Sequence, residues 1–409
     1  MRRHLRLPPR GRSGPWLVAL AVGLLLAIQP IWLDNVAIAV AGALGLTFVA
    51  AARWQLRWLP VVVVVLCGIV LRLSVMHHVA SDVADVTEVA IGTMLYGGDP
   101  YGIGYVVSRP VGAPFPYGPI ALLWYLPMMR DPATLEFLVS VGLMLYFGVR
   151  AGNGRPIGLA VFALAPPLVM AAMNGSNDTS AGLIILAALA VSATRPVAGA
   201  ILLAVAVAFK PYAIAWLPPL VMWSGLQSLV VFVGASIIAW SPVLFVWGPG
   251  SYLKSLAMAQ ETHLREPYWS LGSILASIVP GAEPRALETV RYFISGAVAF
   301  LGGRRVHSID GVIAVGTLAF VIAQFGGYFG SYVYIAAIAP VLCWRVDDWL
   351  RMGLPELVRA YGEVPEVARR LRRPALGTVA RRAEPAPARL LHVGPSQRAR
   401  SRPTRNPTG

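Results

Sequence analysis

Apolar stretches recur along most of the chain and are separated by short polar turns. A helix needs about 20 mainly apolar residues to cross a bilayer, and shorter helices fit where irregular backbone lines a cavity inside a protein. The pattern therefore predicts an all-α fold, a polytopic membrane helical bundle of about 12 spans. We place these spans at residues 15–33, 36–52, 59–77, 134–150, 157–173, 180–194, 197–209, 211–223, 226–246, 287–302, 307–326 and 329–346.

Two longer polar segments interrupt this pattern, at residues 78–133 and 248–286. Crossings counted from the basic N-terminus place both segments outside, whereas short turns rich in Arg, such as 150–155, fall on the inner side. We expect both external loops to contain helices. Within the first loop, residues 118–129 are too few to cross and are expected at the membrane interface.

This topology divides the chain into three parts. Residues 1–14 form a basic cytoplasmic N-terminus, residues 15–346 the transmembrane domain, and residues 347–409 a basic and largely disordered cytoplasmic tail. A stretch at 353–375 has enough Leu and Val for a surface helix. The first apolar run lacks a small-residue cleavage site, so we expect it to be retained as a span.

Composition agrees with a membrane protein and excludes a nucleic-acid partner. The chain is 57% hydrophobic and 13% charged, about half the charged fraction of an ordinary soluble domain. Almost all of the net charge of +15 lies in the two tails, where it favours cytoplasmic retention and contact with anionic membrane lipids. Arg outnumbers Lys 32 to 2, which is typical of a GC-rich bacterial genome and indicates the bacterial plasma membrane. Both cysteines, Cys67 and Cys343, lie in apolar segments, so we expect neither a disulfide framework nor a metal cluster.

The polar residues of the predicted outer face mark the site. Carboxylates at the mouth of a multi-span bundle are costly, and they indicate function by default. Asp82 and Asp85 lead this group, whereas Glu88 and Asp99 are expected to be solvated or part of a turn. The other members are polar or aromatic residues near the predicted ends of spans or in the loops: Asn177, Asp178, Lys210, His263, Arg265, Tyr101, Tyr117 and Trp269.

The order of several short motifs resembles that of the GT-C glycosyltransferases, specifically glycosyltransferase family 87, the polyprenyl-phosphate-mannose-dependent mannosyltransferases once grouped as a domain of unknown function. The resemblance covers about residues 80–275. The motifs that carry it are Asp82, Gly97-Gly98-Asp99-Pro100-Tyr101, Pro114-Phe115-Pro116-Tyr117-Gly118-Pro119, Pro127, the turn 174–180, Lys210-Pro211, Tyr252-Leu253 and Trp269-Ser270-Leu271.

This resemblance implies a GT-C-like enzyme that moves a sugar, mannose before a pentose such as arabinose, from polyprenyl phosphate to a periplasmic glycolipid or polysaccharide acceptor. Such a donor needs no nucleotide site and no cofactor. Asp82 is the expected general base, but the aromatic pair common after it in the family is missing, so Asp85 stays open as the base. Lys210, Arg265 or His263 would meet the phosphate. No metal is expected, although a divalent ion between the two aspartates stays open.

Each assignment has a simpler alternative. Asp82, Asn177 and Asp178 are also suited to helix N-caps, Lys210 to snorkelling toward the interface, and His263 to solvation. The three aromatic residues suit a membrane interface. For the whole protein, the alternatives are a transporter or lipid-glycan flippase, or a non-catalytic scaffold. A transporter usually has internal repeats and ionisable groups near the membrane midplane, whereas the carboxylates here gather at one face.

Overall fold

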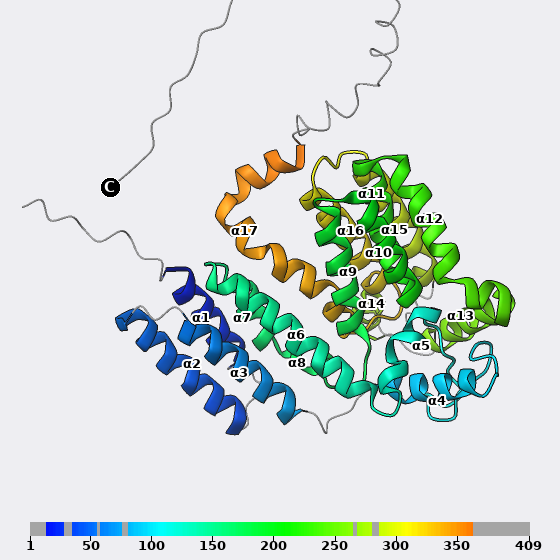
Figure 1. The fold of residues 1–409 in the computed structure, drawn as a ribbon, viewed down its shortest axis with the longest axis horizontal. Helices are drawn as coiled ribbons and strands as arrows, with labels where there is room; N and C mark the ends of the chain where they lie inside the picture. Colours follow the sequence, from blue (N-terminus) through cyan, green and yellow to red (C-terminus); the bar gives the residue numbers. More distant parts are fainter. Residues whose placement is uncertain are drawn as a thin grey trace, which may run out of the picture. The chain divides into compact units, whose positions relative to one another are not determined.

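The computed structural model describes residues 14–27, 35–54, 58–75, 81–264, 268–279 and 286–362, and every regular element within them is helical (Figure 1). The expected all-α fold is therefore confirmed for these ranges. Side chains of residues 353–362 are not part of this description.

The first group of helices is formed by the N-terminal third of the chain. Consecutive helices α1 (Gly14–Ala27), α2 (Asn35–Trp54) and α3 (Trp58–Ser74) pack on one another. Their partners are α6 (Pro132–Gly152) and α7 (Ile157–Leu164), with the short α8 (Pro166–Ala171) beside α7 (Figure 1).

A second group follows along the chain, and α17 contacts both groups. It contains the closely packed pair α9 (Asp178–Ser192) and α10 (Pro196–Phe209). Helix α17 (Tyr334–Gly362) packs on α9 as well as on α7. The remaining helices of this group are η3 (Pro211–Trp216), α11 (Leu217–Ser224), α12 (Leu226–Ala239), α15 (Leu287–Gly303) and α16 (Ile309–Phe325).

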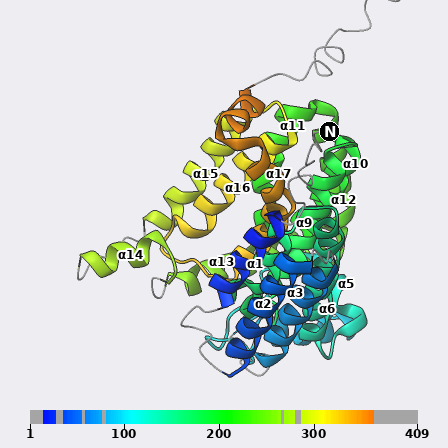
Figure 2. The ribbon, with the colours of Figure 1, turned by 90° about the vertical axis from the view of Figure 1, so that its left-hand side faces the viewer.

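Each of the predicted external loops contains short helices. The first loop contains α4 (Val83–Leu95), α5 (Pro119–Tyr125) and η2 (Leu126–Met128), and the second contains α13 (Pro249–His263) and α14 (Leu271–Ile278). Helices α4, α5 and α13 gather at one end of the described body (Figure 1), and α14 projects from it (Figure 2). Both loops are thus helical, as expected from the sequence.

Several predicted spans differ from the helices observed. The segment 157–173 is broken into α7 and α8, because Pro166 and Pro167 cannot continue the hydrogen bonding of α7. The segment 226–246 leaves the α-helix at Ala239 and continues as a π-helical turn, η4 (Val243–Trp247). By length and composition, one described helix, α6, is long and apolar enough to cross a membrane; the others that are apolar are shorter.

The boundary predicted at residue 347 falls within helix α17. Helix α17 runs without interruption to Gly362, so the first part of the predicted tail extends the last helix of the bundle. Asp347 explains part of this continuity, because its two carboxylate oxygens accept hydrogen bonds from the N–H groups of Ile157 and Gly158 at 3.0 and 2.9 Å. The predictions for residues 1–13 and 363–409 fall outside the described residues.

Arg72 stabilises the break between α7 and α8. The carbonyl groups of Phe162 and Ala163 would normally accept from the residues four positions later, which are Pro166 and Pro167 and have no N–H. The guanidinium of Arg72 donates to these carbonyls instead, at 2.9 and 2.8 Å. Arg72 lies on α3 and is fully buried. No carboxylate is among the hydrogen-bond partners of its guanidinium group. The side chain thus replaces the donors that the two prolines lack.

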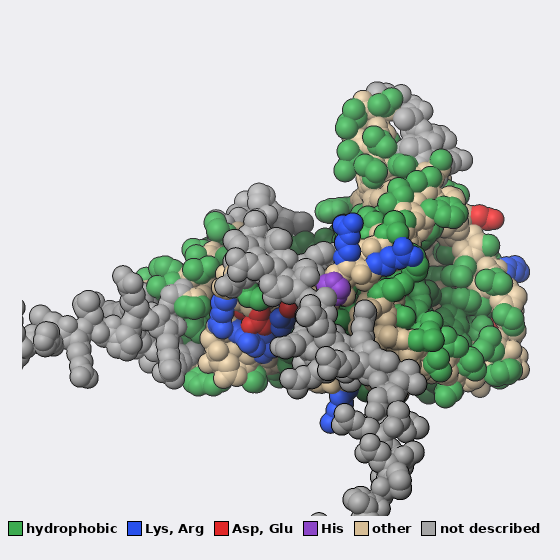
Figure 3. All heavy atoms as spheres, turned by 90° about the horizontal axis from the view of Figure 1, so that it is seen from above, with side chains coloured by type: hydrophobic (Ala, Val, Ile, Leu, Met, Phe, Trp, Pro, Cys, Tyr) green, Lys and Arg blue, Asp and Glu red, His purple; other side chains and the backbone are tan. Residues whose placement is uncertain are grey.

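Many apolar side chains point outward from the helices. On α3, Val62, Leu66, Val70 and Leu73 are about half exposed, at 50, 54, 47 and 47%, although the opposite face of the helix is buried. Similar exposed apolar positions occur on α2, α12 and α15. Hydrophobic side chains also cover much of the face in Figure 3, with basic side chains among them. A helix that is apolar on all sides is typical of a protein core or a membrane span.

We expect Arg72→Met to lower the free energy of unfolding by about 3 kcal/mol, because it leaves two buried carbonyl groups without donors. Denaturant unfolding in detergent solution measures this loss. Arg130→Met is the matched control, since Arg130 is exposed and such changes usually stay within about 0.5 kcal/mol. Equal effects of the two variants would refute the role assigned to Arg72.

Candidate functional site

The start of α4 is held by the turn that precedes α9. The N–H groups of Ser81 and Ala84 donate to the carbonyls of Asn174 and Gly175 at 2.8 and 2.9 Å. Gly175 has φ +84°, a backbone conformation that suits glycine. These bonds fix Asp82, which lies between the two donors, beside residues 174–178.

Asp82 occupies the N-cap position of α4, but its side chain does not cap the helix. Its Oδ2 atom accepts a hydrogen bond from the backbone N–H of Arg109, which belongs to the same external loop. The carboxyl group is half-buried, and Asp85, one turn later, is exposed. The two aspartates therefore differ in environment, and only Asp82 contacts the loop backbone in this way among the hydrogen bonds of the described residues.

A buried ion pair lies behind this turn. Lys210 Nζ is 2.8 Å from Asp178 Oδ1, and the two side chains are 4 and 1% exposed. Tyr212 donates its hydroxyl hydrogen to the same oxygen at 2.7 Å. Lys210 Nζ also lies 4.9, 5.3 and 6.0 Å from the ring centres of Tyr117, Tyr212 and Tyr334. Lys210 is thus enclosed by aromatic rings, and the alternative of snorkelling to the interface is wrong.

Tyr117 links this pair to Asp82. Burial raises the pKa of the Tyr117 hydroxyl well above its usual range, and the negative charges of Asp178 and Asp82 raise it further. The two carboxyl groups therefore act on one phenol from two elements of the fold. Tyr117 as a whole is partly exposed.

Buried polar atoms beside the pair lack partners among the described residues. The atoms without a hydrogen-bond partner are both polar atoms of the Asn177 side chain, Asp178 Oδ2 and Thr179 Oγ1. Asn177 is the residue before α9, yet its side chain does not cap that helix. Asn177 also borders a crevice with residues of α4 and α6, which is too narrow to hold a water molecule. The turn therefore holds hydrogen-bonding capacity that the described protein does not use.

Glu136 is a functional candidate that the sequence interpretation missed. It is 2% exposed; its Oε1 accepts from the hydroxyls of Tyr125 and Ser180, and its Oε2 accepts from the N–H of Ser180 at 3.0 Å. Trp124 Nε1 donates to Ser180 Oγ at 3.0 Å. The signal available in the sequence was an isolated acid within the apolar segment 134–150, a position that usually marks a functional or structural polar contact.

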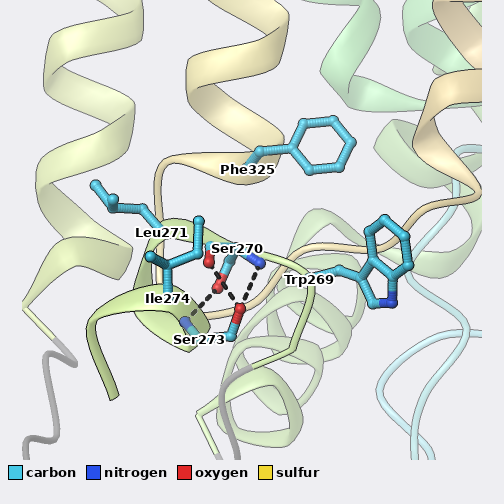
Figure 4. Close-up of a pocket in the computed structure, with 6 residues that line it drawn as sticks. All are labelled: Trp269, Ser270, Leu271, Ser273, Ile274 and Phe325. Atoms are coloured by element: carbon cyan, nitrogen blue, oxygen red, sulfur yellow. Dashed lines mark hydrogen bonds between the residues drawn. The ribbon is translucent and has the colours of Figure 1, made fainter. Parts of the chain in front are cut away.

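Trp269 borders an open cavity of about 520 Å³ (Figure 4). Its backbone has φ +41°, unusual for a residue with a side chain, and the residue is 54% exposed. Its ring lies 5.7 Å from that of Tyr332, whose hydroxyl accepts from Asn174 Nδ2 at 3.0 Å. The same Asn174 binds Ser81, so Trp269 and Asp82 are connected through one turn. The cavity is lined by Trp269, Ser270, Leu271, Ser273, Ile274 and Phe325.

Other predicted residues have different surroundings. Tyr101 is 2% exposed and packs on Phe115, Trp247 and Tyr252, so its ring is part of the loop core. Burial raises the pKa of its hydroxyl far above the ordinary value. Arg265 lies outside the described residues.

His263 stacks on Phe329, with ring centres 4.4 Å apart and planes 4° from parallel. Burial, and then the positive charge of Arg291, lower the pKa of its imidazole to about 4. His263 is therefore neutral near pH 7. It can donate or accept a hydrogen bond there, but it carries no charge for a phosphate.

We expect Lys210→Met to destabilise the protein by about 3 kcal/mol or more, because a buried carboxylate is left without its counter-ion. The double variant Asp178→Asn with Lys210→Met should cost less, since it removes both charges and leaves Tyr212 an amide oxygen to bind. Denaturant unfolding of the three variants, including Asp178→Asn alone, gives the coupling energy. Additive losses would contradict an energetic pairing of the two residues.

Stability should also depend on pH through His263. Because its folded pKa is about 4 and an unfolded His titrates near 6.5, the unfolded state binds protons first as the pH falls. This contribution to stability is complete above pH ~6.5 and is lost progressively toward pH ~4. His263→Phe should flatten the pH dependence of the thermal midpoint in this window. Parallel curves for the variant and the wild type would exclude the effect.

Among the described residues, no three His, Cys, Asp or Glu side chains come together to hold a metal ion. The site is thus a half-buried aspartate and a buried Lys–Asp pair joined by a tyrosine, with an aromatic-edged cavity connected through Asn174. No family model, curated protein or solved structure matches this chain, so an interpretation of its function has to begin from this arrangement.

Proposed function

We propose that the protein is a membrane glycosyltransferase that moves a sugar, with mannose as the expected one, from a polyprenyl-phosphate donor to a periplasmic glycolipid or glycan acceptor. The observation that carries the proposal is the placement of Asp82. This partly accessible carboxylate lies beside the turn that leads to Asp178 of the buried Lys210–Asp178 pair, and the same turn connects it to the cavity beside Trp269. The motif resemblance to family 87 supports the same assignment.

Two features support a membrane location with the site at one face. The outward apolar side chains of α3 and other helices suit lipid contact. In addition, Arg150 and Arg155 pair with Asp348 at the C-terminal end of α6, whereas Glu136 lies in its first turns. A helix of 21 residues separates its ends by about 30 Å, the thickness of the hydrocarbon core. The basic end would then be cytoplasmic, as would both termini of a bundle of about twelve spans.

The reaction needs a general base for the acceptor hydroxyl and a partner for the negative charge that develops on the leaving phosphate. The acceptor hydroxyl oxygen bonds to the anomeric carbon of the donor, and Asp82 takes its proton. The bond from the anomeric carbon to the phosphate oxygen breaks, and its electron pair leaves with the phosphate. The hydrogen bond from the Arg109 N–H holds the carboxylate in place.

The phosphate of the donor needs a cationic partner. Lys210 already binds Asp178 between the tyrosine rings, and we assign it to fixing Asp178 beside the unpartnered Asn177 amide. Arg109 is exposed and its backbone N–H binds Asp82, and we assign its guanidinium to the phosphate of the donor. Arg265 stays a second candidate for this contact. The donor is a substrate, and the reaction as written requires no cofactor or metal.

We expect Asp82→Asn to reduce transfer by about a hundredfold or more, the usual range for loss of a general base. The measurement uses membranes containing the protein, polyprenyl-phosphate-mannose and native glycolipid, with radiolabelled product as the readout. Polyprenyl-phosphate-arabinose, offered in parallel, reports on the choice of sugar.

Asp85→Asn is the matched control, because Asp85 is one turn away on the same helix and exposed. It should keep at least about half of the wild-type rate. Full activity of Asp82→Asn would overturn the assigned base. A wild-type protein that moves a lipid-linked sugar across vesicles without forming a product would instead favour the flippase.

A further inference from the structure

A second buried ion pair, between Glu288 and Arg291, lies in the first turn of α15. The side chains are 1 and 3% exposed. The sequence pattern predicts that a membrane span begins in this segment. The chemistry proposed above does not use the ion pair. Two buried charges this close to the cavity of Trp269 therefore need a separate explanation.

The pair binds the backbone that follows α16. Glu288 Oε2 accepts from the N–H groups of Tyr328 and Phe329 at 3.0 and 3.4 Å. Arg291 Nη1 donates to the carbonyl of Phe329 at 2.7 Å. Both charged groups are thus directed at one short stretch of chain, and we call Glu288 and Arg291 the backbone clamp.

The stretch held by the clamp supports the segment that carries Trp269. Gly330 N–H donates to the carbonyl of Tyr268 at 2.7 Å, and Gly272 N–H donates to the carbonyl of Gly327 at 2.9 Å. Ser270 Oγ donates to the carbonyl of Tyr328 at 2.6 Å. The two backbones approach so closely that a Cβ on Gly330 would lie 2.5 Å from the Trp269 oxygen.

Trp269 is therefore fixed from both sides. Its neighbours Tyr268 and Ser270 are each bound to the clamped backbone, and its own φ of +41° costs free energy that these contacts must offset. Strained backbone of this kind is found at ligand sites more often than elsewhere. The indole is left half-exposed at the edge of the cavity (Figure 4). Its ring centre lies 5.7 Å from that of Tyr332.

The cavity offers few free polar groups for a ligand. Ser270 and Ser273 bind each other through backbone and hydroxyl groups (Figure 4), and the remaining lining side chains are apolar or aromatic. A ligand that enters here is thus recognised by the faces of rings. A sugar presents such an apolar face on its C–H side.

We propose that the backbone clamp is a positioning device that sets the Trp269–Tyr332 ring pair, and that this ring pair receives the sugar ring that is transferred. The proposal deepens the glycosyltransferase assignment and rests on it. Glu288 and Arg291 are positioning residues that act through Trp269, and Trp269 is the residue that contacts substrate.

The positioning of Trp269 by the clamp is tested by a measurement that needs no activity assay. The full-length protein is labelled with 5-fluorotryptophan, and Trp269→Phe identifies the fluorine signal of Trp269. The variant Glu288→Gln with Arg291→Met removes both charges and leaves no unpaired buried ion. It should shift or broaden the Trp269 signal. The matched control, Asp310→Asn with Arg345→Met, removes the pair at the other end of α16 and should leave that signal in place.

The functional half uses the transfer assay. Trp269→Ala and the clamp variant should each raise the KM for the donor by about tenfold with a smaller change in kcat. Combined, they should have no more effect than Trp269→Ala alone, because the clamp acts through that side chain. The control pair should leave KM unchanged.

The outcomes separate the two proposals. A Trp269 signal that does not respond to the clamp variant overturns the positioning role, whatever the activity. A responsive signal with unchanged KM in the clamp and Trp269→Ala variants refutes the sugar contact, and additive effects on KM refute action through Trp269. A responsive signal in a wild-type protein that forms no product from polyprenyl-phosphate sugars upholds the clamp and rejects the glycosyltransferase, and with it the sugar.

Discussion

The ion pair between Asp178 and Lys210 joins the start of α9 to the end of α10 where water is excluded. Removing two charges from water is costly, and their attraction offsets the cost only when the surrounding groups are well placed. Here Tyr212 donates to the same carboxylate oxygen as Lys210, and three rings surround the ammonium group. Because the pair must keep this geometry, it also fixes the turn before α9. Because that turn also holds the start of α4, the geometry of Asp82 depends on the pair.

Much of the helical framework could be predicted from sequence. Apolar periodicity located most helices to within a few residues, and Asp82, Asp178, Lys210 and Trp269 were selected because polar or aromatic groups at the ends of apolar segments are informative. The structure connects these four through a single turn, although they come from distant parts of the chain. The position of Asp347 within a predicted tail shows the opposite case, since a polar residue can continue a helix when it binds a neighbour.

The remaining features depend on tertiary contacts that a linear pattern does not contain. Lys210 looks identical in sequence whether it reaches water or meets Asp178, 32 positions earlier in the chain. Glu288 and Arg291 resemble an ordinary pair one helical turn apart, and their purpose becomes visible only when residues 328–329 lie against them. His263 could be assigned a charge from sequence, but burial and the positive charge of Arg291 lower the pKa of its imidazole to about 4.

A break in a helix is commonly a joint at which a protein bends, but Arg72 makes the break between α7 and α8 a rigid corner. One side chain from a third helix binds both freed carbonyls, so the two segments cannot rotate without losing them. Bending of the helical bundle is therefore expected at other positions. Gly225 and Gly248 flank α12 and η4 with φ of +96° and +88° and open space around them. We expect the segment between these two glycines to move as a unit about its ends, while the corner at Arg72 stays fixed.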